Sequence, residues 1–107
     1  MRYKIRYSPF AVKDMDEVWA GVLEASAEHD IADRYVEEFA DKIAEKKLFP
    51  ESGIPLYYRG LFTGFYSVNF KAYKAFYRIR DGYIEVARII MSKRDYIKIL
   101  FGEESTD

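Results

Sequence analysis

The 107-residue sequence contains no cysteine and only one histidine, His29. Without cysteine the chain can form neither a disulfide framework nor a thiolate metal site, and it suits a reducing compartment. Its charged N-terminus is not followed by the apolar segment of a signal peptide, and its apolar stretches are too short to span a bilayer. We therefore expect a soluble cytoplasmic protein with no membrane partner.

Residues that commonly bind metals or cofactors are few or scattered. We expect His29 to face solvent in the loop between two helices. The carboxylates of those helices fall at positions typical of a helix surface, and Trp19 falls on an apolar stripe typical of a core. The sequence therefore predicts no metal site and no cofactor.

What the sequence does contain is enough apolar residues for one compact domain. Half of the residues are apolar and about a third are charged, a composition far from that of disordered chains. The chain has no internal repeat and no linker long enough to separate two units. We expect a single domain over residues 1–107, with residues 102–107 as a flexible acidic tail.

Charge is unevenly distributed along the chain. Residues 10–55 hold five Lys or Arg against twelve Asp or Glu, whereas residues 56–101 hold nine against three. This separation predicts a basic face opposite an acidic one, and a basic face attracts phosphates or an acidic partner. The alternative is that fold alone separates the charges, because helices favour Glu and sheet edges favour Lys.

The first half of the chain predicts a strand and two helices. Residues 3–7 alternate between apolar and basic, as in a half-buried strand. Ser8 followed by Pro9 predicts a capped helix start, with Asp14 on the solvent side and an end near residues 25–27. We expect Asp30 to cap a second helix with Lys46 and Lys47 in its last turn. The two helices form an antiparallel hairpin that needs a sheet to cover.

The second half predicts three strands and a short helix. Residues 56–64 are open to two interpretations, a loop or a short edge strand. Strands are expected over residues 66–70, 73–80 and 83–91, with Asp81-Gly82 as a type I′ turn. Ser92 is expected to cap a final helix that docks on the sheet. The predicted fold is α+β, in two layers and in the order β-α-α-β-β-β-α, with a helical hairpin on a mainly antiparallel sheet.

The predicted strands place cations together. Lys74, Arg78 and Arg80 share a face because they lie two residues apart, and Arg94 and Tyr96 follow the adjacent strand. Guanidinium groups beside a tyrosine can hold a phosphodiester, and Phe76 on the same face can stack on bases. RNA cleavage also needs proton transfer, for which the candidates are Tyr96, Glu85 or a lysine of depressed pKa. The alternative is a solvated basic face.

The ordered motifs resemble those of the RelE/ParE superfamily of toxins from type II toxin–antitoxin systems. The matching segments are Tyr7-Ser8-Pro9, Phe49-Pro50-Glu51-Ser52-Gly53, the segment 73–79 (YKAFYRI) before the Asp-Gly turn, and the segment 87–96 (ARIIMSKRDY). This resemblance implies a plasmid-stabilisation toxin that arrests growth when it is free of its antitoxin. Its target is either DNA gyrase, as for ParE-like members, or ribosome-bound mRNA, as for RelE-like members.

The resemblance also implies roles for particular residues. In a RelE-like, metal-independent endoribonuclease, Lys74 would take the place of a catalytic arginine, Arg94 that of a phosphate-holding arginine, and Tyr96 would lie beside them. A further set of cations would bind the nucleic acid or another target: Lys71, Arg78, Arg80 and Lys93.

Three positions depart from the ribonuclease pattern. Ser67 and Asn69 stand where RelE has paired lysines, and Met91 stands where related ribonucleases keep a histidine. These departures favour the gyrase-directed branch, with an mRNA endonuclease as the alternative. A further alternative is a non-toxic remnant that only binds its antitoxin for autoregulation. Operator DNA is expected to be reached only through the antitoxin.

Overall fold

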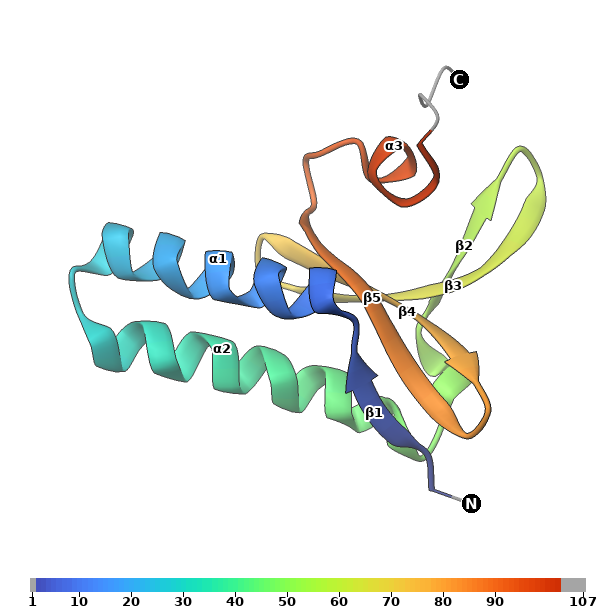
Figure 1. The fold of residues 1–107 in the computed structure, drawn as a ribbon, viewed down its shortest axis with the longest axis horizontal. Coiled ribbons are helices and arrows are strands. Elements are labelled where there is room, and N and C mark those ends of the chain that lie inside the picture. Colours follow the sequence, from blue (N-terminus) through green and yellow to red (C-terminus); the bar gives the residue numbers. More distant parts are fainter. Residues whose placement is uncertain (1, 103–107) are drawn as a thin grey trace.

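The computed structural model describes residues 2–102, which form one five-stranded sheet and three helices. The strands lie in the order β1-β5-β4-β3-β2, and every neighbouring pair is antiparallel except β1 and β5. The predicted α+β class with a helical hairpin on a mainly antiparallel sheet is therefore confirmed (Figure 1). In chain order the elements are β1 (Lys4–Tyr7), α1 (Pro9–Ser26), α2 (His29–Ala44), the 3-10 turns η1 (Glu45–Lys47) and η2 (Pro50–Ser52), β2 (Ile54–Tyr58), β3 (Leu61–Phe70), β4 (Tyr73–Arg80), β5 (Tyr83–Met91) and α3 (Tyr96–Phe101).

The helices cover the two faces of the sheet unequally. Long helices α1 and α2 run side by side (Figure 1) and bury one face, where Phe39 and Ile43 pack with Tyr77 and Val86. Because side chains alternate along a strand, Phe76 points to the opposite face. There it is 1% exposed and lies 5.2 Å, between ring centroids, from Tyr96 of α3. The opposite face is thus covered only in part, by the short helix α3.

The segment that the sequence left open, residues 56–64, belongs to a β-hairpin. Tyr58 pairs with Leu61 across a two-residue turn in which Arg59 and Gly60 both have positive φ, 53° and 79°. This is the backbone pattern of a type I′ turn, which favours Asn-Gly or Asp-Gly. Arg-Gly gives a weaker signal, so the sequence did not reveal that β2 exists and that β3 begins at Leu61.

Helix starts were predicted with mixed success. The Ser8 hydroxyl accepts a hydrogen bond from the Ala11 backbone N–H at 3.0 Å, so this cap is confirmed. Asp30 is not a cap, because α2 already begins at His29 and its N-cap position, Glu28, makes no side-chain cap bond. Ser92 is not a cap either, since the Asp95 carboxylate accepts from the Lys98 N–H.

The expected acidic tail, residues 102–107, falls outside the described residues except for Gly102. That glycine has a φ of 73° and ends α3 in a left-handed cap. No helix within residues 2–102 combines the length and the apolar character needed to cross a membrane.

The Phe49–Gly53 motif has a packing role. The Tyr77 hydroxyl is buried and donates a hydrogen bond to the Pro50 carbonyl at 2.5 Å. Burial raises the pKa of Tyr77 to about 12, so the hydroxyl keeps its proton. A side chain at Gly53 would overlap that hydroxyl. Glycine is therefore required where the loop crosses β4.

Candidate functional site

Asp14 is buried rather than solvent-facing, which corrects the prediction from helix periodicity. It is 8% exposed, and its carboxylate accepts from Arg88 Nε at 2.8 Å, from the second Arg88 nitrogen at 3.1 Å and from the Ile89 N–H at 2.9 Å. The same carboxylate raises the pKa of Arg88. Since both charges are satisfied by each other, this pair attaches α1 to β5 and offers little to a ligand.

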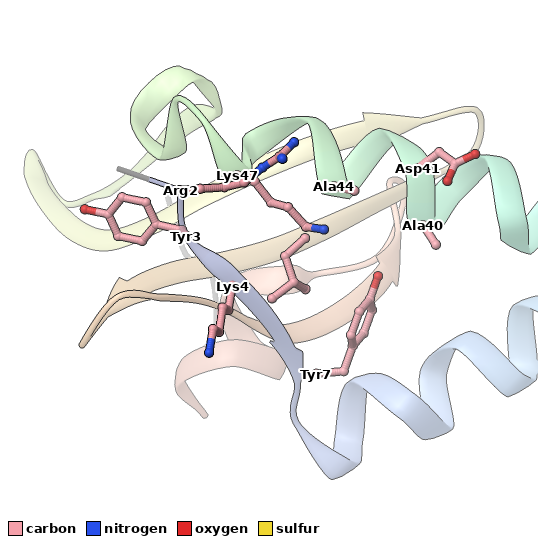
Figure 2. Close-up of a pocket in the computed structure, with 9 residues that line it drawn as sticks. Arg2, Tyr3, Lys4, Tyr7, Ala40, Asp41, Ala44 and Lys47 are labelled. Carbon is pink, nitrogen blue, oxygen red and sulfur yellow. The ribbon is translucent and has the colours of Figure 1, made fainter.

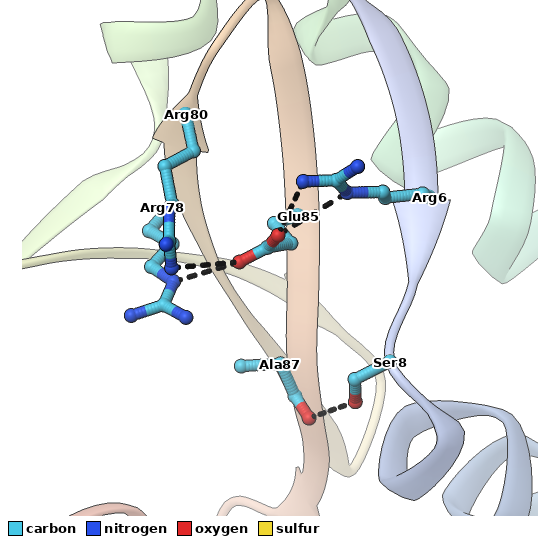
Figure 3. Close-up of polar contacts among 6 residues, drawn as sticks. All are labelled: Arg6, Ser8, Arg78, Arg80, Glu85 and Ala87. Carbon is cyan, nitrogen blue, oxygen red and sulfur yellow. Dashed lines mark hydrogen bonds and ion pairs between the residues drawn. The ribbon is translucent and has the colours of Figure 1, made fainter.

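A β-bulge explains how Arg88 reaches Asp14. Phe76 pairs with Arg88 but its neighbour Tyr77 pairs with Val86, so Ala87 is an extra residue in β5. The Ser8 hydroxyl donates to the Ala87 carbonyl at 2.7 Å, which fixes the start of α1 against the bulge (Figure 3). Bulges redirect side chains. This bulge changes the direction of β5 between Glu85 and Arg88, each of which forms a carboxylate–arginine contact.

Glu85 is surrounded by three arginines, Arg6, Arg78 and Arg80 (Figure 3). We call these four residues the arginine cluster. Arg6 donates to one Glu85 oxygen at 2.8 and 3.2 Å, and Arg78 Nε donates to the other at 2.8 Å. Arg80 lies 3.8 Å from that second oxygen, within ion-pair range but beyond a hydrogen bond. Three cations therefore share one anion on the β1–β5–β4 part of the sheet.

Exposure within the cluster is unequal. Side chains of the three arginines are 48%, 43% and 54% exposed, whereas that of Glu85 is 18% exposed. The hydrogen bond from Arg78 is the largest cause of the lowered pKa of Glu85; burial opposes it, and the hydrogen bond from Arg6 lowers the pKa further. Glu85 therefore stays ionised near neutral pH and makes a poor proton acceptor, because a general base works best with a pKa close to the working pH.

The residues proposed for ribonuclease chemistry are placed separately from this cluster. Lys74 Nζ donates to Asn69 Oδ1 at 2.6 Å across the β3–β4 pair. The Tyr96 ring packs on Phe76, which is buried beneath it. Phe76 therefore cannot stack on bases as the sequence suggested.

The remaining predicted cations lie in turns around the sheet. Lys93 and Arg94 are exposed between β5 and α3, where the Arg94 N–H closes a turn onto the Met91 carbonyl. Lys71, in the β3–β4 turn, places its ammonium 4.8 Å from the centre of the Tyr35 ring. Within residues 2–102 no hydrogen bond or ion pair joins Lys74 to Arg94, and both remain candidates individually.

A hollow of about 760 Å³ lies between β1 and α2 (Figure 2). Arg2, Lys4 and Lys47 contribute three cations to its rim, against the single carboxylate of Asp41. The Tyr7 ring points from β1 toward α2, and burial raises the pKa of its hydroxyl. The hollow therefore offers a mainly basic rim around a surface large enough for binding.

Metal and histidine chemistry find no support in the described part of the chain. Residues 2–102 contain no group of three or more His, Asp or Glu that can hold a metal ion. His29 is exposed, as expected, but it is the first residue of α2 rather than part of a loop. Its ring lies 5.7 Å from that of Trp19, and Trp19 is only half-buried, with its indole N–H bonded to Asp33 at 2.8 Å. The prediction of Trp19 as a core residue is therefore wrong.

The fold is shared with solved structures, among them the following two. The chromosomal ParDE toxin–antitoxin system from P. aeruginosa contains a chain that is 13% identical, with a TM-score of 0.70 over 84% of this chain and 96% of that one. The toxin–antitoxin complex RelBE2 from Mycobacterium tuberculosis contains one that is 23% identical, with a TM-score of 0.56 over 85% and 99%. The molecule thus has the α+β fold of chains in such complexes.

The amino-acid sequence identifies the toxin family to which the chain belongs. Residues 5–96 match the model of the ParE toxin of the type II toxin–antitoxin system parDE. The chain belongs to this family, as the resemblance of its motifs implied. Comparison with curated proteins gives no match.

The sequence did not predict that Arg6 and Glu85 belong to the arginine cluster. Arg78 and Arg80 were predicted on one sheet face, but Arg6 is 79 positions from Glu85 and meets it only because β1 pairs with β5. Glu85 was visible as the one carboxylate among the basic strands. That isolated acidic residue was the available signal that part of the positive charge is compensated internally.

Proposed function

We propose that this toxin inhibits DNA gyrase and is held inactive by a cognate antitoxin in the cytoplasm. The observation that carries the proposal is the match to the ParE toxin family over residues 5–96. ParE-like members of the superfamily poison gyrase, whereas RelE-like members cut mRNA on the ribosome. Family membership therefore favours a protein target that acts on DNA.

The sheet surface supports the same choice. Metal-free RNA cleavage needs a proton acceptor for the 2′-hydroxyl and a donor for the leaving oxygen. Glu85 has a lowered pKa and is engaged by arginines, and Lys74 is bonded to Asn69. Ser67 is 5% exposed, and Met91 is exposed but carries no titratable proton. Among the described residues, a complete acid–base pair beside a phosphate site is missing.

An antitoxin is the partner that this family requires. The ParDE and RelBE2 structures that share this fold are both toxin–antitoxin systems. We expect a short neighbouring reading frame for a ribbon-helix-helix or helix-turn-helix protein, which would bind operator DNA on behalf of the pair. Plasmid stabilisation would follow if the antitoxin is degraded faster than the toxin.

Expression of the chain in bacteria, with and without that neighbour, tests the proposal. Toxin alone should arrest growth, linearise or relax plasmid DNA and induce the SOS response, while the neighbour should restore growth. Cuts within codons, seen by primer extension and without an SOS response, would instead show the RelE-like activity. Normal growth would indicate a non-toxic remnant and would overturn the proposal.

A further inference from the structure

The arginine cluster has more hydrogen-bond donors than its internal carboxylate can use. Each guanidinium carries five N–H donors, but Glu85 accepts only two hydrogen bonds from Arg6, one from Arg78 and none from Arg80. Arg78 uses only Nε, so both of its terminal nitrogens point away from Glu85 (Figure 3). With one negative charge against three positive ones, the cluster keeps an excess of two positive charges on a half-exposed surface.

Aromatic rings hold two of the three guanidinium groups in place. The Arg6 guanidinium carbon lies 4.3 Å from the centre of the Tyr83 ring, and that of Arg78 lies 5.7 Å from the Phe65 ring. Phe65 is itself packed edge-on against Phe101 of α3 at 5.9 Å. Since ring contacts and Glu85 already restrict the arginine rotamers, a bound anion meets donors that lose little further conformational freedom.

An apolar hollow of about 430 Å³ adjoins the cluster and shares Arg78 and Glu85 with it. Its other walls come from the start of α1, from β3, from the β5 bulge with Arg88, and from α3. Phe10, one of these wall residues, leaves 67% of its surface exposed. The apolar lining residues are Phe10, Phe65, Ala87, Ile99 and Leu100.

We infer that the arginine cluster and this hollow form a binding site for an acidic segment of another protein that inserts one apolar side chain. Carboxylates of the segment bind the free donors of Arg78 and Arg80, and Glu85 acts as an internal carboxylate that the segment joins or displaces. The inference goes beyond growth arrest and holds whether or not gyrase is the target.

A peptide fits these features better than a nucleic acid does. Single-stranded nucleic acids bind through exposed aromatic faces along a basic groove. Here Phe76 is buried, Phe65 is half-buried between Arg78 and Phe101, and Phe10 is a single exposed ring rather than one of a row. An apolar pocket flanked by arginines instead matches the anchors of protein interfaces, where an apolar group fills a pocket and arginine pairs with carboxylates.

The probe is a blocked synthetic peptide, Asp-Glu-Phe-Glu-Asp, titrated into the purified full chain and followed by NMR and calorimetry. Backbone signals of Phe65, Arg78 and Ala87 should shift on binding. Arg78→Gln should weaken affinity roughly fivefold, as expected for one charge-assisted contact at a partly exposed site, and Phe10→Ala should also weaken it. Arg34→Gln, the same change at an exposed site on α2, should leave it unaltered.

Glu85→Gln separates this site from a merely structural ion pair. It removes the internal competitor, so peptide affinity should rise about threefold or more, whereas a structural role predicts lower stability and unchanged or weaker binding. Peptides with alanine for phenylalanine, or with lysine for the acids, should bind weakly. Absence of binding, shifts confined to other surfaces, insensitivity to Arg78→Gln, or tighter binding of a short oligothymidylate would each overturn the inference.

Discussion

Asp14 and Glu85 are two carboxylates that bind arginines of the same sheet, and they differ in the number of arginines that share each carboxylate. Asp14 is buried and satisfied by one arginine and one backbone N–H. Glu85 faces three arginines that are about half exposed. A carboxylate matched one-to-one stabilises a fold, whereas an excess of exposed donors leaves binding capacity for another molecule.

The largest loss of stability is expected from breaking the Asp14–Arg88 pair. Asp14→Ala leaves the Arg88 guanidinium and the Ile89 N–H without their acceptor. Asp14 is buried but Arg88 is 31% exposed, so loss of the carboxylate should lower the free energy of unfolding by about 3 kcal/mol, the lower end of the cost of breaking a buried pair. Urea unfolding followed by circular dichroism measures this. Asp16→Ala, on the exposed side of α1, should stay within about 0.5 kcal/mol of wild type, and equal effects of the two would contradict the distinction.

A second buried contact, between Tyr77 and the Phe49–Gly53 loop, should be the next most sensitive. Gly53→Ala forces a methyl group against the Tyr77 hydroxyl and should destabilise the protein by about 1–3 kcal/mol. Gly21→Ala is the matched control, because Gly21 lies in α1 with open space around it. This control should be neutral or stabilising by up to about 1 kcal/mol, since alanine is the better helix former. A tolerated Gly53→Ala would show that the loop is free to move away from β4.

Of the three contacts, the one between Glu85 and its arginines should contribute least to the free energy of unfolding. Its contribution should depend on pH. The pKa of Glu85 is lowered in the folded state, so its contribution is present above the ordinary value of about 4.3 and is lost as pH falls below it. Because its partners are half exposed, that contribution should not exceed about 1 kcal/mol. Glu85→Gln should therefore slightly reduce the loss of stability as pH falls below about 4.3. A loss as large as that of Asp14→Ala would make the cluster structural.

No change in toxicity is expected from removing the proposed ribonuclease cations. If gyrase is the target, the double variant Lys74→Ala, Arg94→Ala should still arrest growth and induce the SOS response. Lys74 is already bonded to Asn69, and Arg94 is an exposed turn residue. Growth curves at matched expression measure this, with Arg34→Gln as the neutral control. Loss of growth arrest in the double variant would favour the RelE-like alternative.

Short sequence motifs, such as helix caps and turn residues, predicted most of the fold but fewer of the contacts at the site. Ser8-Pro9 and Asp81-Gly82 act through their own backbone, so the helix start and the turn with φ of 50° and 77° were readable from the sequence. Arg59-Gly60 forms the same kind of turn from a residue that rarely signals it, so residues 56–64 stayed open between a loop and a short edge strand.

The site depended on contacts that no local pattern contains. Asp14 has the spacing of a surface residue, and only the packing of α1 on β5 buries it. Arg6 joins Glu85 through the parallel β1–β5 pair, which connects the two ends of the chain. Alternation did predict that Arg78 and Arg80 share a face, but it could not show that α3 would bury Phe76 on that face. Long-range pairing therefore decided which cations remain available.

Purified gyrase provides the most direct test of the central claim. The full chain, incubated with gyrase, ATP and relaxed plasmid, should block supercoiling or trap linear, enzyme-linked DNA, and the cognate antitoxin should prevent this. In a parallel translation reaction the chain should leave ribosome-bound mRNA intact. Unimpaired supercoiling together with cleaved mRNA would contradict the account.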